Sequence, residues 1–385
     1  MLSREIKDKL MERETPFYLY DMGLLRRTLE TIRTESSRYG FKVHYAVKAN
    51  FDEELLKVIR EYGLGIDCVS GNELRLVRSL GFPASSVVYA GVGKSDKEIR
   101  YAIEEGICAF NCESRQELQV INEIAGRLGL RARVALRVNP DVDPHTHRHI
   151  STGHADSKFG IAYTEIEEVA REFASLEHVE LVGLHFHIGS QILDMRIFEY
   201  FCKRVNTLLG WFREHGFPIH YLNMGGGLGI DYERPDQFPV TDFADYFATF
   251  DRFLDREGME VHFELGRAVV AQCGELITRV LFEKVNALGH HVVIVDASMS
   301  QLIRPALYEA YHAIENLSAR SAETGTYTIA GTVCESADVF AKERTLPRLQ
   351  RGDLLSIKSA GAYGASMASR YNLHDFPESV YSDRL

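Results

Sequence analysis

Lys48 stands at the end of a short segment of alternating apolar residues, VHYAVKAN (residues 43–50). Such alternation is typical of a β-strand. A lysine at a strand end has two interpretations. It can be a surface residue whose stem covers apolar neighbours while its ammonium stays in water. It can also be an amine with a depressed pKa that forms an imine with a carbonyl compound. The octapeptide alone favours the first interpretation, because most lysines only solvate a surface.

Eight apolar segments of strand length recur along the chain, separated by helical patterns such as EELLKVIREYG and QELQVINEIAG. The segments are 43–49, 64–70, 87–91, 109–114, 134–139, 181–189, 221–227 and 261–267. Several helical patterns begin with an S-x-x-E capping box, at Ser70, Ser95 and Ser114. Strand, capped helix and strand in regular succession indicate parallel βαβ units. Eight such units predict an α/β fold, a TIM-type (β/α)8 barrel, with a doubly wound open sheet as the alternative.

The pattern changes after about residue 272. The remaining chain holds β-like segments, GELITRVLFEKV, HHVVIVDA, TYTIAGTVC and DLLSIKSAGAY, and one helix-like stretch near ALYEAYHAIEN. Residues 17–21 (FYLYD) resemble a lone strand, and a helix is expected from about Met22 to Tyr39. We therefore expect a barrel over residues 22–272 and a C-terminal, mainly β domain over residues 273–385, which residues 1–21 join.

The ends of the eight predicted strands carry the residues that could do chemistry, since all of them meet at one mouth of a barrel. In chain order they are Lys48, Asp67, Gly91, Glu113, Asn139, His187 with Ser190, Gly225–Gly227, and Glu264 with Arg267. The glycine run MGGGLG offers backbone N–H groups to a phosphate, or is only a tight turn. The segment ELGR offers a carboxylate and a guanidinium, or is only an ion pair at a strand end.

Histidines and a cysteine leave alternatives open. In HFHIGS, His187 could lie flat on a planar cofactor while Ser190 binds a phosphate, although two core histidines are the commoner outcome. The loop DPHTHRHISTGH (143–154) carries alternating histidines, but it lacks the rigid framework of a metal site, so we expect a flexible lid and no metal. Cys334, in CESADVF, is an inert buried thiol or, with acidic neighbours, a reactive one.

Composition excludes several classes of function. The net charge of −11 argues against a nucleic-acid or acidic-membrane partner, because both need a basic face. The six cysteines include no CxxC pair, so neither a zinc site nor a disulfide framework is indicated. The first residues are charged, and no segment approaches membrane-spanning length. We expect a cytoplasmic protein that acts on a small molecule.

An imine-forming lysine, a phosphate cradle, a stacking ring and a carboxylate for a ring nitrogen together describe pyridoxal 5′-phosphate (PLP) bound in a barrel. The chain resembles the fold-type III PLP-dependent decarboxylases over nearly its whole length, and most closely the branch that acts on diaminopimelate. The motifs that carry the resemblance are YAVKAN, GVGKSDKEI, NPDVDPHTHRHISTG, KFGI, GLHFHIGSQI, GGGLGIDY, ELGR, LIRPALYEAYH, CESADVF and GAYGASMASRYN.

The resemblance implies an alanine-racemase-like barrel with a C-terminal β domain. It also implies a homodimer whose two active sites are shared across the interface. The reaction it implies is decarboxylation of meso-2,6-diaminopimelate to L-lysine and CO2, the last step of lysine biosynthesis by the diaminopimelate route.

The site residues implied by the resemblance fall into three groups. Lys48 would be the Schiff-base lysine and Cys334 the proton donor, reaching in from the neighbouring subunit. The cofactor would lie among Asp67, His187, Ser190, Gly225, Gly226, Gly227, Glu264, Leu265, Gly266, Arg267 and Tyr363. The substrate's far end would lie among Arg267, Arg304, Tyr308, Glu335 and Tyr363.

The chain departs from the family's usual residues at Ser298, Gln301, Leu265 and Thr332, none of which is a catalytic group. Three other functions share the barrel. A polyamine-type decarboxylase of ornithine, arginine or carboxynorspermidine would not need Arg304 and Glu335 for a second amino-acid head. An alanine racemase would carry an arginine at the ring nitrogen, where Glu264 stands here. A PLP carrier without activity would not need Cys334.

Overall fold

The protein is described by a computed structural model that covers residues 4–140, 142, 158–173, 175–217 and 219–385. The chain forms two compact units. The barrel unit comprises Leu29–Gly229 and Asp242–Gly266, and the β unit comprises Met1–Thr28, Ile230–Thr241 and Arg267–Leu385. The division into domains at residue 272 stays a prediction. The compact units differ from it in that Ile230–Thr241, expected in the barrel, groups with the β unit.

The barrel unit is built on eight parallel strands that close on themselves, because β5 pairs with β6 as well as with β4. These strands are β2 (Lys42–Ala46), β3 (Gly65–Cys68), β4 (Val87–Tyr89), β5 (Ala109–Cys112), β6 (Ala132–Asn139), β8 (Val179–His185), β9 (Tyr221–Asn223) and β10 (Glu260–Leu265). A two-residue strand, β7 (Ile161–Ala162), adds to β6. The prediction of a (β/α)8 barrel is confirmed, and the open-sheet alternative is wrong.

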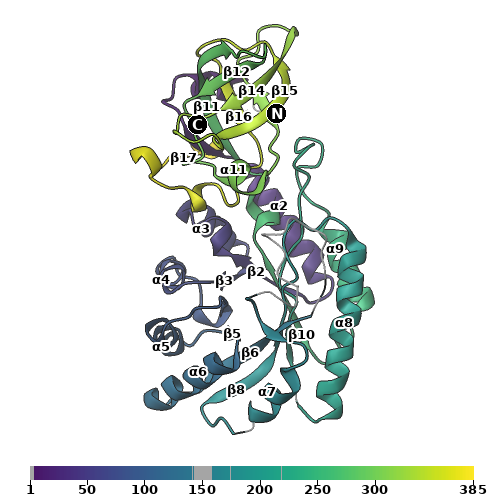
Figure 1. Cartoon of the computed structure of the whole chain (residues 1–385). Coiled ribbons are helices and arrows are strands. Elements are labelled where there is room, and N and C mark those ends of the chain that lie inside the picture. Colours follow the sequence, from purple (N-terminus) through teal and green to yellow (C-terminus); the bar gives the residue numbers. More distant parts are fainter. Residues whose placement is uncertain (1–3, 141, 143–157, 174, 218) are drawn as a thin grey trace. The chain divides into compact units, whose positions relative to one another are not determined.

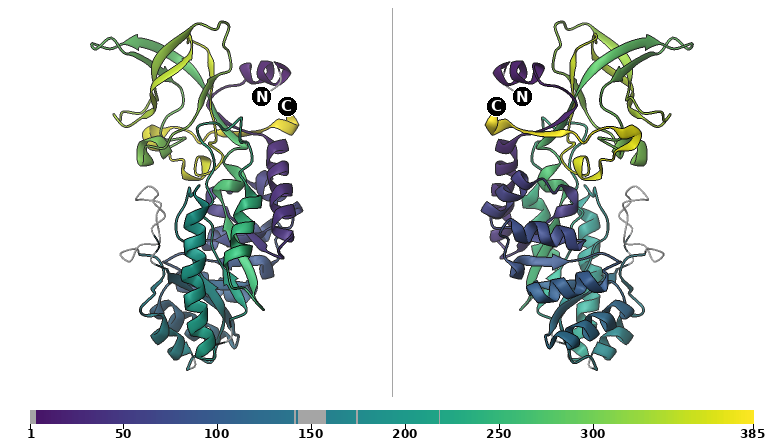
Figure 2. Two further views of the ribbon diagram at one scale, coloured as in Figure 1. Left: turned by 90° about the vertical axis from the view of Figure 1, so that its right-hand side faces the viewer. Right: turned by 90° about the vertical axis from the view of Figure 1, so that its left-hand side faces the viewer.

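Helices follow the strands and surround them (Figures 1 and 2). They are α3 (Glu53–Glu61), α4 (Gly71–Ser79), α5 (Asp96–Glu105), α6 (Arg115–Leu128), α7 (Ile166–Phe173), α8 (Met195–Glu214) and α9 (Phe243–Phe253), with α2 (Met22–Ser37) before β2. As predicted, Ser70, Ser95 and Ser114 are the N-caps of α4, α5 and α6. Each cap satisfies backbone groups that the first helical turn leaves unpaired, so the strand ends before these helices are held in place.

The β unit is an eight-stranded sheet with short helices. Its strands are β1 (Phe17–Tyr20), β11 (Gly274–Val285), β12 (His291–Val295), β13 (Ile314–Asn316), β14 (Thr324–Ala330), β15 (Val339–Pro347), β16 (Leu354–Ile357) and β17 (Glu378–Tyr381). Its helices are α1 (Arg4–Met11), α10 (Arg267–Val270) and α11 (Arg304–Tyr308). Single 3-10 turns occur in the chain at η1 (Val47–Ala49), η2 (Ala84–Ser86), η3 (Ala365–Met367), η4 (Tyr371–Leu373) and η5 (Ser382–Arg384).

The N-terminal strand joins this sheet as expected, since β1 pairs antiparallel with β11 and parallel with β17. The two ends of the chain meet in the same unit, where Lys9 donates a hydrogen bond to the carbonyl of Leu385 (Figure 2). The expectation of one helix near ALYEAYHAIEN is only partly right. The helix α11 ends at Tyr308, where Glu309 adopts a left-handed φ of 52°, and β13 takes over at Ile314.

Among the described residues, no helix is long and apolar enough to cross a membrane.

Candidate active site

Lys48 lies in η1, directly after β2, at the C-terminal end of the barrel strands. Its ammonium Nζ donates a 2.8 Å hydrogen bond to Oδ2 of Asp67, which comes from the neighbouring strand β3. The Asp67 side chain has no exposed surface, whereas the Lys48 side chain is 39% exposed. Burial, and then the nearby charge of Glu264, raise the pKa of Asp67 to about 7, although Lys48 opposes this rise. The barrel mouth therefore holds an accessible amine beside a carboxyl group that titrates near neutrality.

Glu264 is a buried carboxylate near the end of β10. Its Oε1 accepts hydrogen bonds from the amides of Asn111 (2.8 Å) and Asn223 (2.7 Å). Its Oε2 lies 3.0 Å from Nε2 of His185. Burial would raise the pKa of Glu264, but His185 and then Lys48 outweigh it and hold that pKa well below its usual range. Glu264 is thus a buried carboxylate that stays ionised, as a partner for a protonated ring nitrogen must.

The ring of His187 is fixed as a neutral tautomer. The backbone N–H of Gly226 donates to its Nδ1 at 3.2 Å, so the proton of the neutral ring sits on Nε2. Burial, followed by the charges of Arg137 and Lys48, lowers the pKa of His187 well below its ordinary value. A neutral ring without net charge suits stacking against a flat aromatic group.

The glycine run after β9 lies against the backbone of its neighbours. A Cβ at Gly225 would collide with the carbonyl oxygen of Phe186, and one at Gly226 with that of Glu264. Gly225 and Gly227 also adopt φ values of 67° and 109°. The N–H groups of Gly225 and Gly226 are already donated, to Asn223 and His187. The expectation that these two N–H groups are bare is therefore wrong, because they orient the ring and the amide next to Glu264.

A second buried carboxylate holds the loops at this end of the barrel. Glu113 pairs with Arg137 at 2.6 Å, and both side chains are nearly inaccessible to solvent. It also accepts hydrogen bonds from the backbone N–H groups of Gly91 (3.2 Å) and Gly160 (2.9 Å). A buried ion pair needs such additional donors to offset its desolvation. Glu113 thus has a structural role at the C-terminal end of the barrel strands.

In the β unit, Arg267 begins α10 and is buried. Its guanidinium donates to the hydroxyl of Tyr232 at 2.6 Å and lies 5.0 Å from the ring centroid of Tyr363. Burial lowers the pKa of Arg267, but Tyr232 and Tyr363 outweigh it and raise that pKa overall. Tyr363 adopts a positive φ of 57°, which an ordinary side chain rarely takes. Such strain at a residue stacked on a buried cation is typical of a binding site.

Arg304, at the start of α11, is also buried. It donates to Nε2 of His312 at 2.9 Å, while Nδ1 of His312 lies 2.8 Å from the carbonyl of Lys358. Because both neighbours fix its tautomer, His312 is neutral, and burial followed by the charge of Arg304 lowers its pKa to about 3. The Nε atom of Arg304 is buried and has no hydrogen-bond partner among the described residues. An unpaired buried guanidinium N–H is costly unless an acceptor reaches it.

Cys334 is exposed, which rules out the inert buried thiol. Its loop is held by Asp338, whose carboxylate accepts from the N–H groups of Val333 (2.9 Å) and Met299 (2.7 Å). Glu335 is exposed as well and accepts a 2.6 Å hydrogen bond from the hydroxyl of Tyr371. The loop thus presents a thiol and a carboxylate side by side to solvent.

The remaining predicted residues have these places. Ser190 lies after β8, Leu265 ends β10 and is buried, Gly266 follows it, and Tyr308 ends α11. The predicted lid, 143–154, lies outside the described residues. The unusual residues Ser298 and Gln301 bond to one another, since Oε1 of Gln301 accepts from the N–H and the hydroxyl of Ser298. The hydroxyl of Thr332 lies 3.5 Å from Nε2 of His374.

Several residues of this site were missing from the sequence-based prediction. His185, Asn111 and Asn223 surround Glu264, and Tyr232 receives Arg267. His185 is two residues before His187, and Asn223 is two residues before Gly225. A polar side chain on the inward face of a barrel strand is the signal that could have identified them.

The chain is similar to known proteins of one family. Residues 23–271 match the family described as "Pyridoxal-dependent decarboxylase, pyridoxal binding domain". A diaminopimelate decarboxylase of Bacteroides thetaiotaomicron is 48% identical over 380 residues, which are 98% of each chain. The chain belongs to the diaminopimelate decarboxylase family. A relative of the same name from Aquifex aeolicus is 43% identical over 93% of this chain and 84% of its own.

A solved structure of this family supports the fold. Diaminopimelate decarboxylase from Helicobacter pylori, complexed with L-lysine, superposes with a TM-score of 0.93 at 35% identity. The match covers 99% of this chain and 94% of that one. The predicted membership of a PLP-dependent lyase family is therefore confirmed.

The residues of the barrel mouth fit the cofactor that the family description names. Oδ1 of Asp67, Oδ1 of Asn111 and Nδ1 of His185 are buried without a hydrogen-bond partner among the described residues. Glu264 is ionised, the accessible amine of Lys48 faces a carboxyl group, and the neutral ring of His187 is held edge-on to the glycine loop. These are the groups that an aromatic aldehyde with a ring nitrogen requires.

Proposed function

We propose that this protein removes CO2 from meso-2,6-diaminopimelate and forms L-lysine, as the last step of lysine biosynthesis by the diaminopimelate route. The observation that carries the choice of substrate is the buried guanidinium of Arg304, whose Nε has no hydrogen-bond partner in the part of the chain that the structure describes. Diaminopimelate has an amino-acid head at each end, so an enzyme must hold one carboxylate while it breaks off the other. A guanidinium pairs with a carboxylate through parallel N–H donors.

PLP would be held covalently by Lys48 and would supply an electron sink for the decarboxylation. Lys48 contributes the amine that binds the aldehyde, and Asp67 can take a proton from it because its pKa lies near 7. Glu264 keeps the ring nitrogen protonated, which strengthens the sink. His187 would stack on the ring, and Ser190 with the glycine loop would hold the phosphate.

Arg267 and Tyr363 would be phosphate and substrate ligands. Both are held in place by contacts within the β unit, since Arg267 is fixed between Tyr232 and Tyr363. Arg304 and Tyr308 receive the far carboxylate, and Glu335 receives the far ammonium.

Cys334 would be the proton donor of the reaction. We propose that the protein is a homodimer and that Cys334 of the partner subunit performs this step. The exposure of Cys334 and Glu335 supports the assignment, because groups that complete a neighbour's site must lie on the surface of their own chain.

The alternative is a related decarboxylase of ornithine, arginine or carboxynorspermidine, whose substrate lacks the second amino-acid head. The test offers each of these compounds, and meso-diaminopimelate, to the PLP-loaded protein and measures released CO2 and the amine product. Release from meso-diaminopimelate alone, with equimolar lysine, supports the proposal. Faster release from any of the other three would assign the protein to the polyamine group.

A further inference from the structure

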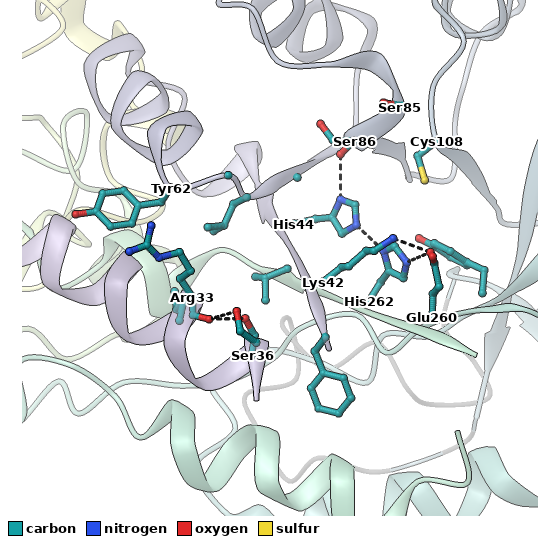
Figure 3. Close-up of a pocket in the computed structure, with 18 of the residues that line it drawn as sticks. Arg33, Ser36, Lys42, His44, Tyr62, Ser85, Ser86, Cys108, Glu260 and His262 are labelled. Atoms are coloured by element: carbon teal, nitrogen blue, oxygen red, sulfur yellow. Dashed lines mark hydrogen bonds and ion pairs between the residues drawn. The ribbon is translucent and has the colours of Figure 1, made fainter. Parts of the chain in front are cut away.

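The barrel has a cavity at the N-terminal ends of its strands, and therefore at the end opposite Lys48. Its volume is about 400 Å³, and its lining includes Lys42, Gly65 and Glu260, which begin β2, β3 and β10 (Figure 3). Cavities of small-molecule sites begin at roughly 300 Å³. The floor of this one is made by two buried histidines, His44 and His262.

These histidines form a chain of hydrogen bonds with one direction. Nδ1 of His44 lies 3.2 Å from the carbonyl oxygen of Ser86, and Nε2 of His44 lies 2.8 Å from Nδ1 of His262. A carbonyl only accepts, so the proton of His44 sits on Nδ1 and its Nε2 keeps a lone pair. His262 must then donate from Nδ1. In a neutral His262, Nε2 therefore carries a lone pair and no proton.

Nothing in the described structure donates to that lone pair. Nε2 of His262 is buried without a hydrogen-bond partner. Oε2 of Glu260 lies 3.4 Å from it and accepts a 2.8 Å hydrogen bond from Nζ of Lys42 (Figure 3). Burial, and then the charges of His44 and Lys42, lower the pKa of His262 to about 2, so the two residues do not form an ion pair at neutral pH. Nε2 of His262 thus lacks a donor, whereas the neighbouring Oε2 of Glu260 accepts from Lys42. Because a carboxylate oxygen can accept more than one hydrogen bond, a cationic donor beside both atoms would satisfy Nε2 and also bond to Oε2.

Neighbouring residues hold the two histidines of the floor in this arrangement. A Cβ at Gly65 would collide with Nδ1 of His44 and lie 2.7 Å from the carbonyl oxygen of Ser86, so any other residue there would break the chain. The ring of Tyr221 lies against His262, with 4.2 Å between centroids. The unpaired nitrogen is therefore held in one direction by its surroundings.

The rim of the cavity carries cations, whereas its floor carries hydrogen-bond acceptors. Lys42 and Arg133 line the rim, and both lie close enough to His262 for their charges to lower its pKa. A simple amine would meet these two cations, whereas a ligand that also carries a carboxylate would be matched by them. The lining also includes the apolar side chains of Ile32, Phe41 and Leu64, which suit an aliphatic group.

We propose that this cavity binds a small aliphatic α-amino acid as a zwitterion. Its ammonium donates to Nε2 of His262 and to Oε2 of Glu260, which also accepts from Lys42, and its carboxylate lies at Lys42 and Arg133. The site is separate from the PLP site, because it lies at the other end of the strands.

The test is calorimetric titration of the PLP-loaded protein at pH 7.5 with L-leucine, n-butylamine and isovalerate as probes. L-Leucine should bind saturably, and more tightly than the compounds that carry only its amine or only its carboxylate. Glu260→Gln removes the charge that receives the ammonium, and Arg133→Gln removes a cation that receives the carboxylate. Each should weaken L-leucine binding by about 10-fold or more, the scale of one charge-assisted hydrogen bond.

Glu123→Gln is the matched control, since Glu123 is as exposed as Glu260 and is also ion-paired, with Arg127 on α6. It should leave L-leucine binding unchanged, and neither variant at a surface glutamate threatens folding. If L-leucine binds but Glu260→Gln and Arg133→Gln leave its affinity unchanged, it binds at the PLP site, and the proposal is overturned. The absence of binding, or equal binding of n-butylamine or isovalerate, would also overturn it.

Discussion

The ammonium of Lys48 lies 2.8 Å from a carboxylate oxygen of Asp67 whose side chain has no exposed surface. The ion pair does not offset the desolvation of Asp67, because burial and the charge of Glu264 still raise its pKa to about 7. A carboxyl group so placed can exchange a proton with the neighbouring amine at neutral pH. The protonation state of Asp67 thus affects both the stability of the barrel and proton exchange with Lys48.

Asp67 should make the PLP-free protein less stable as the pH rises. Its folded pKa of about 7 is above the unfolded value, so the folded state holds the proton more tightly. Its contribution to stability is therefore full below about pH 4 and is lost as the pH rises through about 7. Asp67→Asn removes this titration. The difference between the Tm of Asp67→Asn and that of the wild type, measured by calorimetry, should therefore shift in favour of the variant from pH 5 to pH 8.

Asp375→Asn is the control, because the carboxylate of Asp375 is 93% exposed. Its Tm should follow that of the wild type across the same range. A constant difference between Asp67→Asn and wild type would show that Asp67 ionises alike in the folded and unfolded states.

Glu264→Gln should retain PLP and lose catalysis. The amide would remove the charge that keeps the ring nitrogen protonated. With its carbonyl oxygen accepting from Asn111 and Asn223, it would turn its NH2 group toward His185. Loss of one preorganised electrostatic group costs about 100- to 1000-fold in kcat. Visible absorbance should show bound cofactor, while CO2 release from meso-diaminopimelate falls on that scale. Unchanged kcat would remove Glu264 from the electron sink.

Arg304→Ala should keep PLP and its absorbance but lose substrate. Truncating one partner of a buried charge pair costs about 2–5 kcal/mol, which is roughly 30- to 5000-fold in kcat/KM. Arg267 is a poorer probe, because its cofactor and substrate contacts would be lost together. Arg370→Ala is the control, since Arg370 is 65% exposed and 3.6 Å from its acidic partner. If Arg304→Ala acts on meso-diaminopimelate as well as the control does, the far-end clamp is wrong.

Lys48→Ala and Cys334→Ala should complement each other when their subunits exchange. With shared sites, half of the randomly reassorted dimers are hybrids, and each hybrid has one intact site of two. About a quarter of wild-type activity should therefore return. Mixing the double variant with inactive Lys48→Ala protein should restore none. If exchange is proven by native mass spectrometry and no activity returns, each site is built within one chain.

The sequence predicted the barrel because its determinants are local. Segments of strand length alternate with helices that begin at Ser70, Ser95 and Ser114, and each cap is decided within a few residues. The strand ends that follow from this alternation include Lys48, Asp67 and Glu264. Their proximity needs only the rule that parallel strands end at one mouth.

What the sequence did not predict depends on side chains from distant strands. The partners of Glu264 come from β5, β8 and β9, and no local pattern distinguishes Asn111 from a surface asparagine. Likewise, the glycine run suggested bare N–H groups, but the side chains of Asn223 and His187 accept two of them. The helix after Arg304 stops at Tyr308 because Glu309 turns left-handed, which the apolar periodicity of the segment does not reveal.

Covalent attachment of PLP to Lys48 is the central claim, and it can be read directly. Borohydride reduction of the PLP-loaded protein fixes the cofactor on the lysine that holds it, and peptide mapping by mass spectrometry then identifies that lysine. The account predicts one pyridoxyl group per chain, on the peptide that contains Lys48, and none on the same peptide of Lys48→Arg. A pyridoxyl group on any other lysine of the wild-type protein would contradict the account.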